Sequence, residues 1–415
     1  MAFMGLVSCF QKKHNDGTEA EAGVITYHIP APGKITKAEK ENIYRGSEAF
    51  YDTLLAASGF NGGIIVAKKG NIIFERYKGS VNLDGKTAIT DSTPFHVASV
   101  SKTFTAMTIL KLQEEGKLNI HDPLSKYFPE FNYPGVTIKT LLNHRSGLPN
   151  YLYFMEDLGW NKDSVILNKD VLQWLIAKKS EIPNIAPADA HFTYCNTNYA
   201  LLALLIEKVT GRSYPQYMQD NVFGPLGMKN TFVHYAGDNR TRSKSFDWRG
   251  GEIPDNFLDA VYGDKNIYTT PRDLLIWDRA LSDTVFLSAA SMDSAYIPYS
   301  NEKAGIKNYG LGWHLNIYPN GKKLIFHNGW WHGNNAAFIR PLQDDATIIL
   351  ISNRYCRAVY KSKYLVNLFE HYFDIDVEDN ENNSGSAETL SADSSKTTVK
   401  KVQPRILKRK RGRRR

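Results

Sequence analysis

The chain has 415 residues, of which 42% are hydrophobic and 12% aromatic, a composition ordinary for globular proteins and too apolar for a disordered one. The net charge of +8 is local, because residues 402–415 hold eight Lys or Arg and no acid, while the rest of the chain carries 43 basic and 43 acidic side chains. Neutrality outside the tail argues against a nucleic-acid-binding surface on the folded part, so we expect any polyanion binding to belong to the tail.

The N-terminal segment raises the question of a lipid anchor. The three cysteines, Cys9, Cys195 and Cys356, do not make a disulfide framework. The tetrapeptide LVSC at 6–9, followed by polar residues, resembles a bacterial lipobox, although the apolar run before it is shorter than the roughly 7–15 residues of a signal segment and lacks a basic start. Two interpretations stay open: a periplasmic or membrane-anchored bacterial lipoprotein, which we favour, and a chance tetrapeptide in a cytoplasmic protein.

The first predicted elements are a tether, a helix and a hairpin. Residues 1–44 are expected to form a tether before the domain, because the stretch from residue 10 to 45 is polar and contains Pro30 and Pro32. A helix is predicted over 43–57, where apolar residues recur on one side. In the stretch 62–82, two β-branched or aromatic runs flank Lys-Gly-Asn at 69–71, which predicts an antiparallel hairpin.

The stretch Pro94–Gly116 carries the first candidate for chemistry. It predicts an extended segment and then a helix that starts near Ser99 and stops at Gly116. Ser99 and Lys102 are three residues apart and so share one helix face, where an amine can take the proton of a hydroxyl if burial lowers its pKa. The alternative is a helix-capping serine and a surface lysine, and the same Ser-x-x-Lys pattern recurs in the polar stretch 300–303.

The middle of the chain is predicted to be mostly helical. Its helices are expected at 136–143, 169–179, 199–210 and 271–281. A second polar cluster, Tyr194 and Asn196, lies in a short loop directly before the most apolar of these helices. Tyr-x-Asn also occurs at 299–301 and 318–320, but neither of those copies leads into such a helix.

Strands return near the C-terminus, and a final amphipathic helix follows over 360–373. The strand runs are 310–318, 322–329, 334–341 and 345–353. Strands at both ends of the sequence and helices between them predict an α+β fold, in which one antiparallel sheet is built from both chain ends, flanked by helices, with a mostly helical subdomain inserted. The cleft between the sheet and the subdomain is the expected site.

A third cluster, His327-Asn328-Gly329, ends one of these strand runs. A glycine there leaves a strand edge bare, so that a substrate backbone can lie alongside it. Residues 374–415 are acidic and Ser-rich and then basic, and we predict a disordered tail. We expect this tail to have no specific role. Contact with anionic envelope polymers or membrane is the second possibility, and nucleic-acid binding is the third.

Three clusters in this order resemble the serine β-lactamase and penicillin-binding protein family, in its class C-like branch with D-alanyl-D-alanine carboxypeptidases and related esterases. The motifs are Ser-x-x-Lys at 99–102, Tyr-x-Asn at 194–196 and a Lys/His-x-Gly strand motif at 327–329. The connecting segments LLNHRSGLP, PLGMKNT, YTTPRDLLIWDRAL and YGLGW are similar as well. The resemblance implies a β-lactamase/transpeptidase-like domain over 45–373.

The resemblance also implies roles for the clusters. Ser99 would attack a carbonyl and form an acyl-enzyme, and Lys102 and Tyr194 would share the proton transfers, with the base left open between them. Asn196 would hold Lys102 and bind a substrate carbonyl. The oxyanion hole would consist of the backbone N–H groups of Ser99 and Trp330.

Four residues, at three places in the chain, depart from the family pattern. His327 stands where β-lactamases usually carry a lysine that attracts the carboxylate of the drug, and a histidine is mostly neutral near pH 7. Trp330 and Trp331 either form an apolar or stacking subsite or merely pack against the subdomain. Cys195 is expected to be a small packed residue and not a nucleophile.

We therefore expect a serine hydrolase that acts through Ser99 on a D-Ala-D-Ala-type peptide, an ester or an amide, with β-lactam hydrolysis second. An alternative of another class is a non-catalytic protein that binds cell-wall peptide. No cofactor or metal is expected, because His327 and His332 have no third ligand at a recognisable spacing. The expected partner is a small-molecule or peptide substrate, with membrane anchoring through Cys9 as a further possibility.

Overall fold

The computed structural model describes residues 26–182 and 185–374. Cys9 and the predicted tail from residue 375 on lie outside the described residues, so the interpretations of both remain predictions. Among the described helices none is both long and apolar enough to cross a bilayer.

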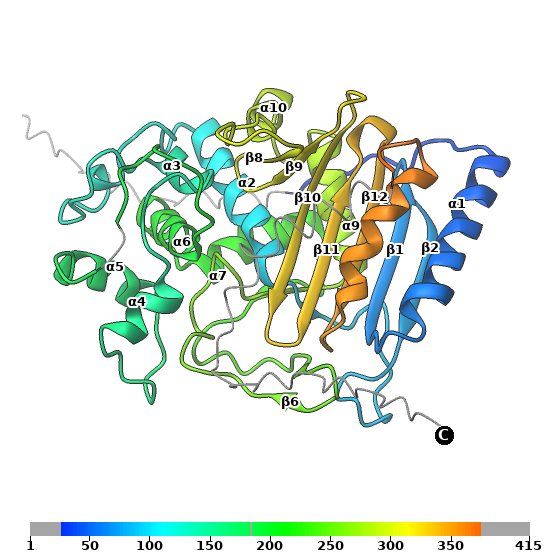
Figure 1. Cartoon of the computed structure of the whole chain (residues 1–415), viewed down its shortest axis with the longest axis horizontal. Coiled ribbons are helices and arrows are strands. Elements are labelled where there is room, and N and C mark those ends of the chain that lie inside the picture. The colour runs from blue at the N-terminus through cyan, green and yellow to red at the C-terminus, as the bar shows by residue number, and fades with distance from the viewer. Residues whose placement is uncertain (1–25, 183–184, 375–415) are drawn as a thin grey trace, which may run out of the picture.

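A seven-stranded antiparallel sheet forms the right half of Figure 1. In spatial order its strands are β2 (Asn71–Lys78), β1 (Gly62–Lys68), β12 (Ala346–Ser352), β11 (Asn334–Arg340), β10 (Lys323–Trp331), β9 (His314–Ile317) and β8 (Lys307–Tyr309). The first two come from the N-terminal part of the chain and the other five from the C-terminal part. The prediction of a sheet built from both chain ends is confirmed, and with it the α+β class.

The sheet is covered on both faces, which explains why its central strands are nearly all apolar. Ile64 of β1 lies opposite Leu350 of β12, and Ile65 lies opposite Ile349. Because side chains of a strand alternate between faces, Ile64 enters one core cluster and Ile65 the other. Burial on both faces favours such continuous β-branched runs over alternation of polar and apolar residues.

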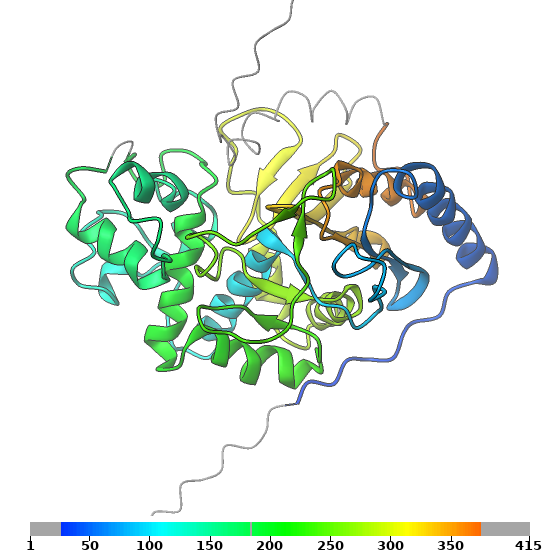
Figure 2. The same ribbon diagram turned by 90° about the horizontal axis from the view of Figure 1, so that it is seen from below.

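One face carries the two terminal helices. These are α1 (Lys37–Phe50), which continues into a π turn, and a 3₁₀ helix over Arg357–Leu368. Figure 2 shows the blue N-terminal helix and the orange C-terminal helix on the same side of the sheet. Their contact is close, since a Cβ on Gly46 of α1 would lie 2.2 Å from the side chain of Leu368.

The other face packs against α2 (Ser101–Glu114), and α2 lies between the sheet and the helical region (Figure 1). From Ser101 to Leu110 every residue of α2 is buried, so this helix is surrounded on all sides. The other helices are α3 (Ile138–Leu142), α4 (Tyr151–Asp157), α5 (Asn168–Ala177), α6 (Asn196–Thr210), α7 (Tyr214–Met218), α8 (Gly224–Leu226), α9 (Pro271–Ser282) and α10 (Ala289–Ala295). Two small sheets complete the fold: β3 (Phe95–His96) with β7 (Ile267–Thr269) and β4 (Phe232–Val233), and the pair β5 (Ser245–Phe246) and β6 (Glu252–Ile253).

Two predicted boundaries differ from the structure. The helix predicted to start at 43 begins at Lys37, because the Thr36 side chain caps it by accepting a hydrogen bond from the Glu39 N–H at 3.1 Å. The chain is already packed before this helix, since the Tyr27 N–H donates to the Pro225 carbonyl at 3.0 Å. The folded part therefore starts earlier than residue 45. The final helix is 3₁₀ over Arg357–Leu368 and not the predicted helix over 360–373.

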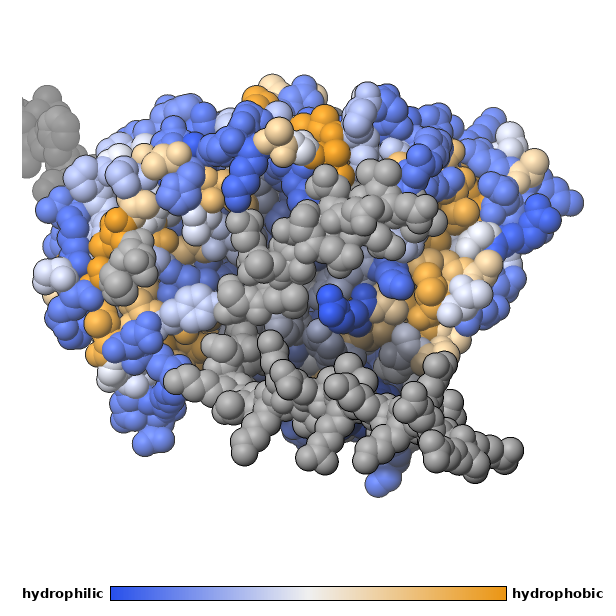
Figure 3. All heavy atoms as spheres, viewed as in Figure 1, coloured by the Kyte–Doolittle hydropathy of each residue, from blue (hydrophilic) through white to orange (hydrophobic). Residues whose placement is uncertain are grey.

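The face of the molecule in Figure 3 carries mostly hydrophilic residues, with apolar side chains only in small groups. The apolar residues of the strands and of α2 lie inside, in two clusters on either side of the sheet. This division leaves the polar clusters of the sequence as the features that require a functional explanation.

An internal ion pair joins the sheet to α9. Arg340 of β11 is 0% exposed, and its Nε donates to Oδ1 of Asp278 at 2.5 Å. Because Asp278→Ala leaves this guanidinium buried and unpaired, we expect the variant to lose about 3–5 kcal/mol of unfolding free energy in urea titrations. Asp283→Ala removes a more exposed partner of Arg279 on the same helix and should cost no more than about 1 kcal/mol. Equal losses in the two variants would contradict this account.

Candidate active site

Ser99 lies in a 3₁₀ turn, Ala98–Val100, immediately before α2. Ala98 has φ 47°, a left-handed conformation that an alanine adopts only when its surroundings hold it there. One such restraint is His96, whose Nδ1 accepts a hydrogen bond from the Ala98 N–H at 3.2 Å. The turn leaves Ser99 partly exposed while its two neighbours are buried, so the hydroxyl is accessible.

Lys102 is fully buried one turn further along, and its Nζ reaches back to the serine. It donates to Ser99 Oγ at 3.0 Å, to Asn196 Oδ1 at 2.7 Å and to the Asp264 carbonyl at 2.8 Å. Burial lowers the pKa of Lys102 to about 7, and the charge of Asp264 opposes that shift only in part. The lowered pKa brings the neutral form of the amine, which can accept a proton, within reach near neutral pH.

Tyr194 and Asn196 reach the same place from the loop before α6. The Tyr194 hydroxyl is hydrogen-bonded to Ser99, and the centre of its ring lies 5.0 Å from Lys102 Nζ. Burial raises the pKa of Tyr194 above its ordinary value, so the phenol keeps its proton at neutral pH. Of these two side chains, Lys102 is the one whose pKa is lowered toward neutrality.

Strand β10 passes directly over the serine turn. A Cβ on Gly329 would lie 2.2 Å from the Val97 carbonyl oxygen, so only glycine allows this approach. β9 pairs with β10 only over Lys323–Phe326, and beyond that point the strand lies against the serine turn. Asn328 and Trp330 flank the glycine and are partly exposed.

His327 stands where β-lactamases carry a carboxylate-binding lysine, but it does not offer its side chain to a ligand. The residue is 0% exposed, its Nδ1 donates to the Asn328 carbonyl at 2.7 Å, and its Nε2 lies 3.2 Å from the Tyr309 hydroxyl. Burial holds the pKa of His327 well below its ordinary value, and the nearby His314 and Lys102 act in the same direction. Burial therefore disfavours the protonated, charged form of this side chain.

The two tryptophans do not form one aromatic subsite. They are adjacent on a strand and therefore point to opposite faces. Trp331 shares the face of Gly329, and its Nε1 donates to Asp259 Oδ1 at 2.5 Å. The indole of Trp330 donates instead to the His332 carbonyl at 2.9 Å, and its ring lies 6.0 Å from that of Tyr355.

Cys195 is a packed residue with no sign of reactivity. It is 2% exposed and unpaired, and burial raises the pKa of its thiol to about 11. A thiolate is the nucleophilic form of cysteine, so this side chain is inert near neutral pH.

A second buried lysine adjoins the site, and the sequence reading did not identify it. Lys265 is 3% exposed, lies 3.5 Å from Asp264 Oδ2 and donates to the Tyr151 hydroxyl. Tyr151 in turn donates to Asp264 Oδ2 at 3.0 Å. The charge of Lys265 contributes to the lowered pKa of Lys102. The only signal in the sequence is the polar run Gly-Asp-Lys-Asn at 263–266 beside a short apolar strand.

His144 was not among the predicted site residues either, because its segment, LLNHRSGLP, counted only as a connecting segment in the family resemblance. Its Nδ1 accepts the Cys195 N–H at 3.2 Å, and its ring centre lies 4.3 Å from that of Tyr194. His144 therefore fixes the backbone of the loop that presents Tyr194.

Tyr194→Phe is expected to lower kcat by about 10²–10³-fold, because it removes a proton-transfer group and keeps the ring packing. The melting temperature should stay close to that of the unmodified protein. Hydrolysis of a chromogenic ester together with thermal unfolding measures both, and Tyr235→Phe, which changes an exposed tyrosine, is the matched control. Full activity in Tyr194→Phe would mean that the phenol has no part in proton transfer.

Comparisons with known proteins bear on the family and the fold of the chain. A family model described as Beta-lactamase matches residues 48–363. The chain is 31% identical over 332 residues to penicillin-binding protein 4* of Bacillus subtilis, covering 76% of this chain and 73% of that protein. Two solved structures share the fold. One is the penicillin binding protein from Bacillus halodurans, with a TM-score of 0.67, 24% identity and coverage of 77% of this chain and 98% of that one. The other is a D-stereospecific amidohydrolase from Streptomyces sp., with a TM-score of 0.61, 22% identity and coverage of 78% and 98%.

Proposed function

The chain belongs to the beta-lactamase family and is a serine hydrolase in general type, and on this premise we propose that it hydrolyses a D-Ala-D-Ala-type peptide, an ester or an amide through an acyl-enzyme on Ser99. The observation that carries the proposal is the buried Lys102 Nζ, 3.0 Å from Ser99 Oγ. An amine with a pKa of about 7 is matched to general-base work near neutral pH.

In the first step, neutral Lys102 takes the proton of Ser99 as Oγ bonds to the substrate carbonyl carbon. The carbonyl oxygen becomes an oxyanion, which the backbone N–H groups of Ser99 and Trp330 stabilise. Lys102 and Tyr194 then deliver the proton to the leaving amine or alcohol as its bond to the carbonyl carbon breaks. In the second half, water bonds to the acyl carbon and its proton passes through Lys102 and Tyr194 to Ser99 Oγ. The bond between Ser99 Oγ and the acyl carbon breaks, and the acid is released.

Asn196 positions the base in this scheme. Its Oδ1 accepts from Lys102 Nζ at 2.7 Å, while the Asp264 carbonyl accepts from the same nitrogen at 2.8 Å. Because these two acceptors hold two N–H groups of Lys102, the lone pair of the neutral amine is directed at Ser99. Orienting the reacting groups in this way is a large part of how an enzyme lowers the barrier of a reaction. The Asn196 amide nitrogen is left to bind the substrate carbonyl.

The substrate order rests on the strand motif. Enclosed His327 supplies no cation for a substrate carboxylate, which β-lactam drugs carry and a D-Ala-D-Ala peptide carries at its C-terminus, so this position favours ester or amide substrates over β-lactams. The names of the similar proteins do not rank these substrates, since one is a penicillin-binding protein and another a D-stereospecific amidohydrolase. β-Lactam hydrolysis is the second candidate.

The test is a substrate panel on the purified full chain: nitrocefin, p-nitrophenyl esters of graded length and a D-Ala-D-Ala peptide. We expect turnover of an ester or the peptide to exceed that of nitrocefin. A fluorophosphonate or fluorescent penicillin should label the protein covalently, and Ser99→Ala should lose the label. Failure of both probes and of all substrates would favour the non-catalytic peptide-binding alternative.

A further inference from the structure

The segment of residues 263–266, just before β7, braces α2 through its main chain. The Gly263 carbonyl accepts the Thr105 hydroxyl at 2.7 Å, and the Asp264 carbonyl accepts Lys102 Nζ at 2.8 Å. Gly263 has φ 92°, a left-handed conformation that glycine adopts without strain. The backbone of this segment therefore fixes the position of one acceptor for the catalytic amine.

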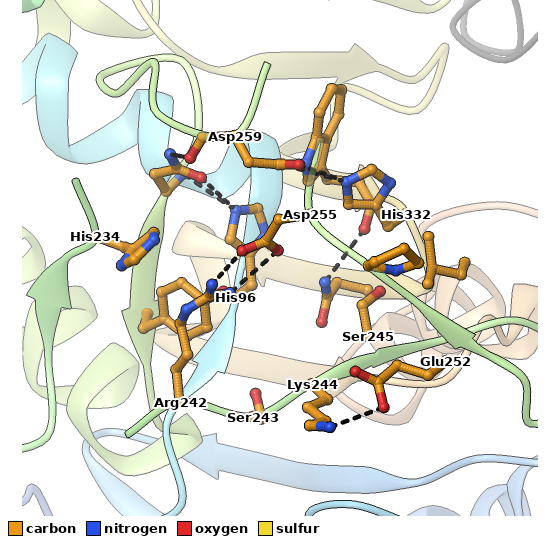
Figure 4. A pocket seen from close by; sticks show the side chains of 16 residues that line it. His96, His234, Arg242, Ser243, Lys244, Ser245, Glu252, Asp255, Asp259 and His332 are labelled. Atoms are coloured by element: carbon orange, nitrogen blue, oxygen red, sulfur yellow. Dashed lines mark hydrogen bonds and ion pairs between the residues drawn. The ribbon is translucent and has the colours of Figure 1, made fainter. Parts of the chain in front are cut away.

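Asn266 connects the same segment to the serine turn. Its Oδ1 lies 3.0 Å from His96 Nε2, and His96 Nδ1 accepts the N–H of Ala98, the residue before Ser99. The Asn266 amide also donates to the Asp259 carbonyl at 2.7 Å. Figure 4 shows His96 and Asp259 in the wall of a cavity that borders the segment. The segment thus contacts the surroundings of the nucleophile as well as the catalytic amine.

Lys265 places a second cation inside this segment. Its side chain is 3% exposed, and its Nζ donates to the Tyr151 hydroxyl and lies 3.5 Å from Asp264 Oδ2. Tyr151 donates to the same carboxylate oxygen at 3.0 Å, and the centre of the Trp331 ring lies 4.8 Å from the lysine Nζ. Because Lys265, Asp264 and Tyr151 are all enclosed by protein, the lysine charge is screened far less than it would be in water.

Two carboxylates favour the charged form of Lys265. Burial lowers the pKa of this lysine, but the charges of Asp264 and then of Asp259 oppose that shift. Asp259 is held by His332, whose Nε2 lies 3.0 Å from its Oδ2 (Figure 4). Burial tends to raise the pKa of Asp259, yet the contact with His332 and further hydrogen bonds lower it to about 2. This carboxylate therefore stays charged near neutral pH.

The amine of Lys102 has different neighbours. The other titratable side chains that face it are Tyr194 and Cys195 before α6, Tyr199 of α6, His144 after α3, His314 of β9 and His327 of β10. Burial favours the neutral form of each of these six groups. Burial is also the largest cause of the lowered pKa of Lys102; among the charges of the described residues, Asp264 opposes this shift and Lys265 adds to it.

We propose that Lys265 is a positioning residue for acyl transfer at Ser99, which acts through Lys102: its enclosed charge repels a proton from the catalytic amine, and its hydrogen bond to Tyr151 holds the segment that orients that amine. The inference rests on the proposed function, because it assigns Lys265 a part in that reaction. Two like charges enclosed at one place oppose each other. The lysine with two carboxylate neighbours keeps its proton, and the other is left able to accept one.

The first test is the pH dependence of kcat/KM for a chromogenic ester and the purified full chain. In Lys265→Met the midpoint of the rise should move upward by about one pH unit, because the variant loses the charge that opposes protonation of Lys102. Below the midpoint kcat/KM should therefore be about ten-fold lower than in the unmodified protein, and the two should converge in alkaline buffer. Lys265→Arg keeps the cation and should keep the midpoint.

The matched control is Lys323→Met, which changes a partly buried lysine of β10 and should leave the pH profile where it is. A merely structural role of Lys265 predicts a different result. In that case Lys265→Met would lower the rate at every pH by the same factor and would not move the midpoint, and the proposal would be overturned.

A second variant guards against a loss of fold, since Lys265→Met leaves the buried Asp264 carboxylate without its lysine partner. Lys265→Met combined with Asp264→Asn removes both charges and keeps the backbone carbonyl that accepts Lys102 Nζ. Because Asp264 acts on the pKa of Lys102 more strongly than Lys265 does, the midpoint should return to that of the unmodified protein or fall below it. A midpoint that stays where Lys265→Met put it contradicts the proposal.

A direct titration of Lys102 separates this inference from the proposed function. The full chain is produced with lysine labelled with ¹³C at Cε, the Lys102 signal is identified by its loss in Lys102→Met, and its chemical shift is followed against pH without substrate. We expect the midpoint to move upward in Lys265→Met and to stay in Lys265→Arg. If it moves although no substrate is hydrolysed, the coupling of the two lysines stands and the proposed function fails. If Lys265→Met leaves it unmoved while Ser99 still hydrolyses the ester, the inference alone is overturned.

Discussion

Ser99→Ala is expected to lower kcat by roughly 10⁴-fold or more, because the variant has no hydroxyl to form the acyl-enzyme. The fold should persist. Ser99 is partly exposed, and Lys102 Nζ keeps its hydrogen bonds to Asn196 and to the Asp264 carbonyl. Ester hydrolysis, intact-mass detection of a fluorophosphonate adduct and thermal unfolding together measure the effect.

The chain supplies its own control for this experiment. Ser300 begins a second Ser-x-x-Lys pattern, in the loop between α10 and β8, far from any helix N-terminus that might activate it. Ser300→Ala should therefore keep full activity and full labelling. Loss of activity in Ser300→Ala would show that the nucleophile is assigned wrongly. Substantial remaining activity in Ser99→Ala would show the same.

Lys102→Met is expected to cost about 10²–10⁴-fold in kcat/KM, the range for loss of a positioned general base. In the unmodified protein, kcat/KM should rise with pH through about 7, because the amine accepts the Ser99 proton only in its neutral form. Lys111→Met alters a partly exposed lysine of the same helix and should keep both the rate and the pH profile. A rise near pH 7 that persists in Lys102→Met would assign that titration to another group.

The same lysine predicts how stability depends on pH. Its pKa is 10.5 in the unfolded reference and about 7 when folded, so the unfolded chain binds more protons between these values. The penalty of burying the charge is therefore fully present below about pH 7 and disappears as the pH rises toward 10.5. Lys102→Met should melt at a higher temperature than the unmodified protein below pH 7, and the gap should narrow in alkaline buffer.

Local sequence was sufficient for the strands and for the order of the polar clusters. The apolar runs around Ile65 and Ile349 are typical of strands buried on both faces, and such strands are found there. The hairpin at 62–82 also forms, with Lys69 and Gly70 in its turn at positive φ. Boundaries were less certain where a side-chain cap decides them, as Thr36 does for α1.

The sequence by itself determined the fold class, the β-lactamase family and the candidates Ser99, Lys102, Tyr194 and Asn196, because periodicity and motif order are local properties. Only the tertiary structure decided the chemistry of those groups. Lys102 has its lowered pKa because residues 94 and 162 positions away enclose and bind its amine. Burial likewise keeps His327 neutral, and strand pleating separates Trp330 from Trp331. Solvent exclusion depends on distant segments packing together, and no pattern within one segment records it.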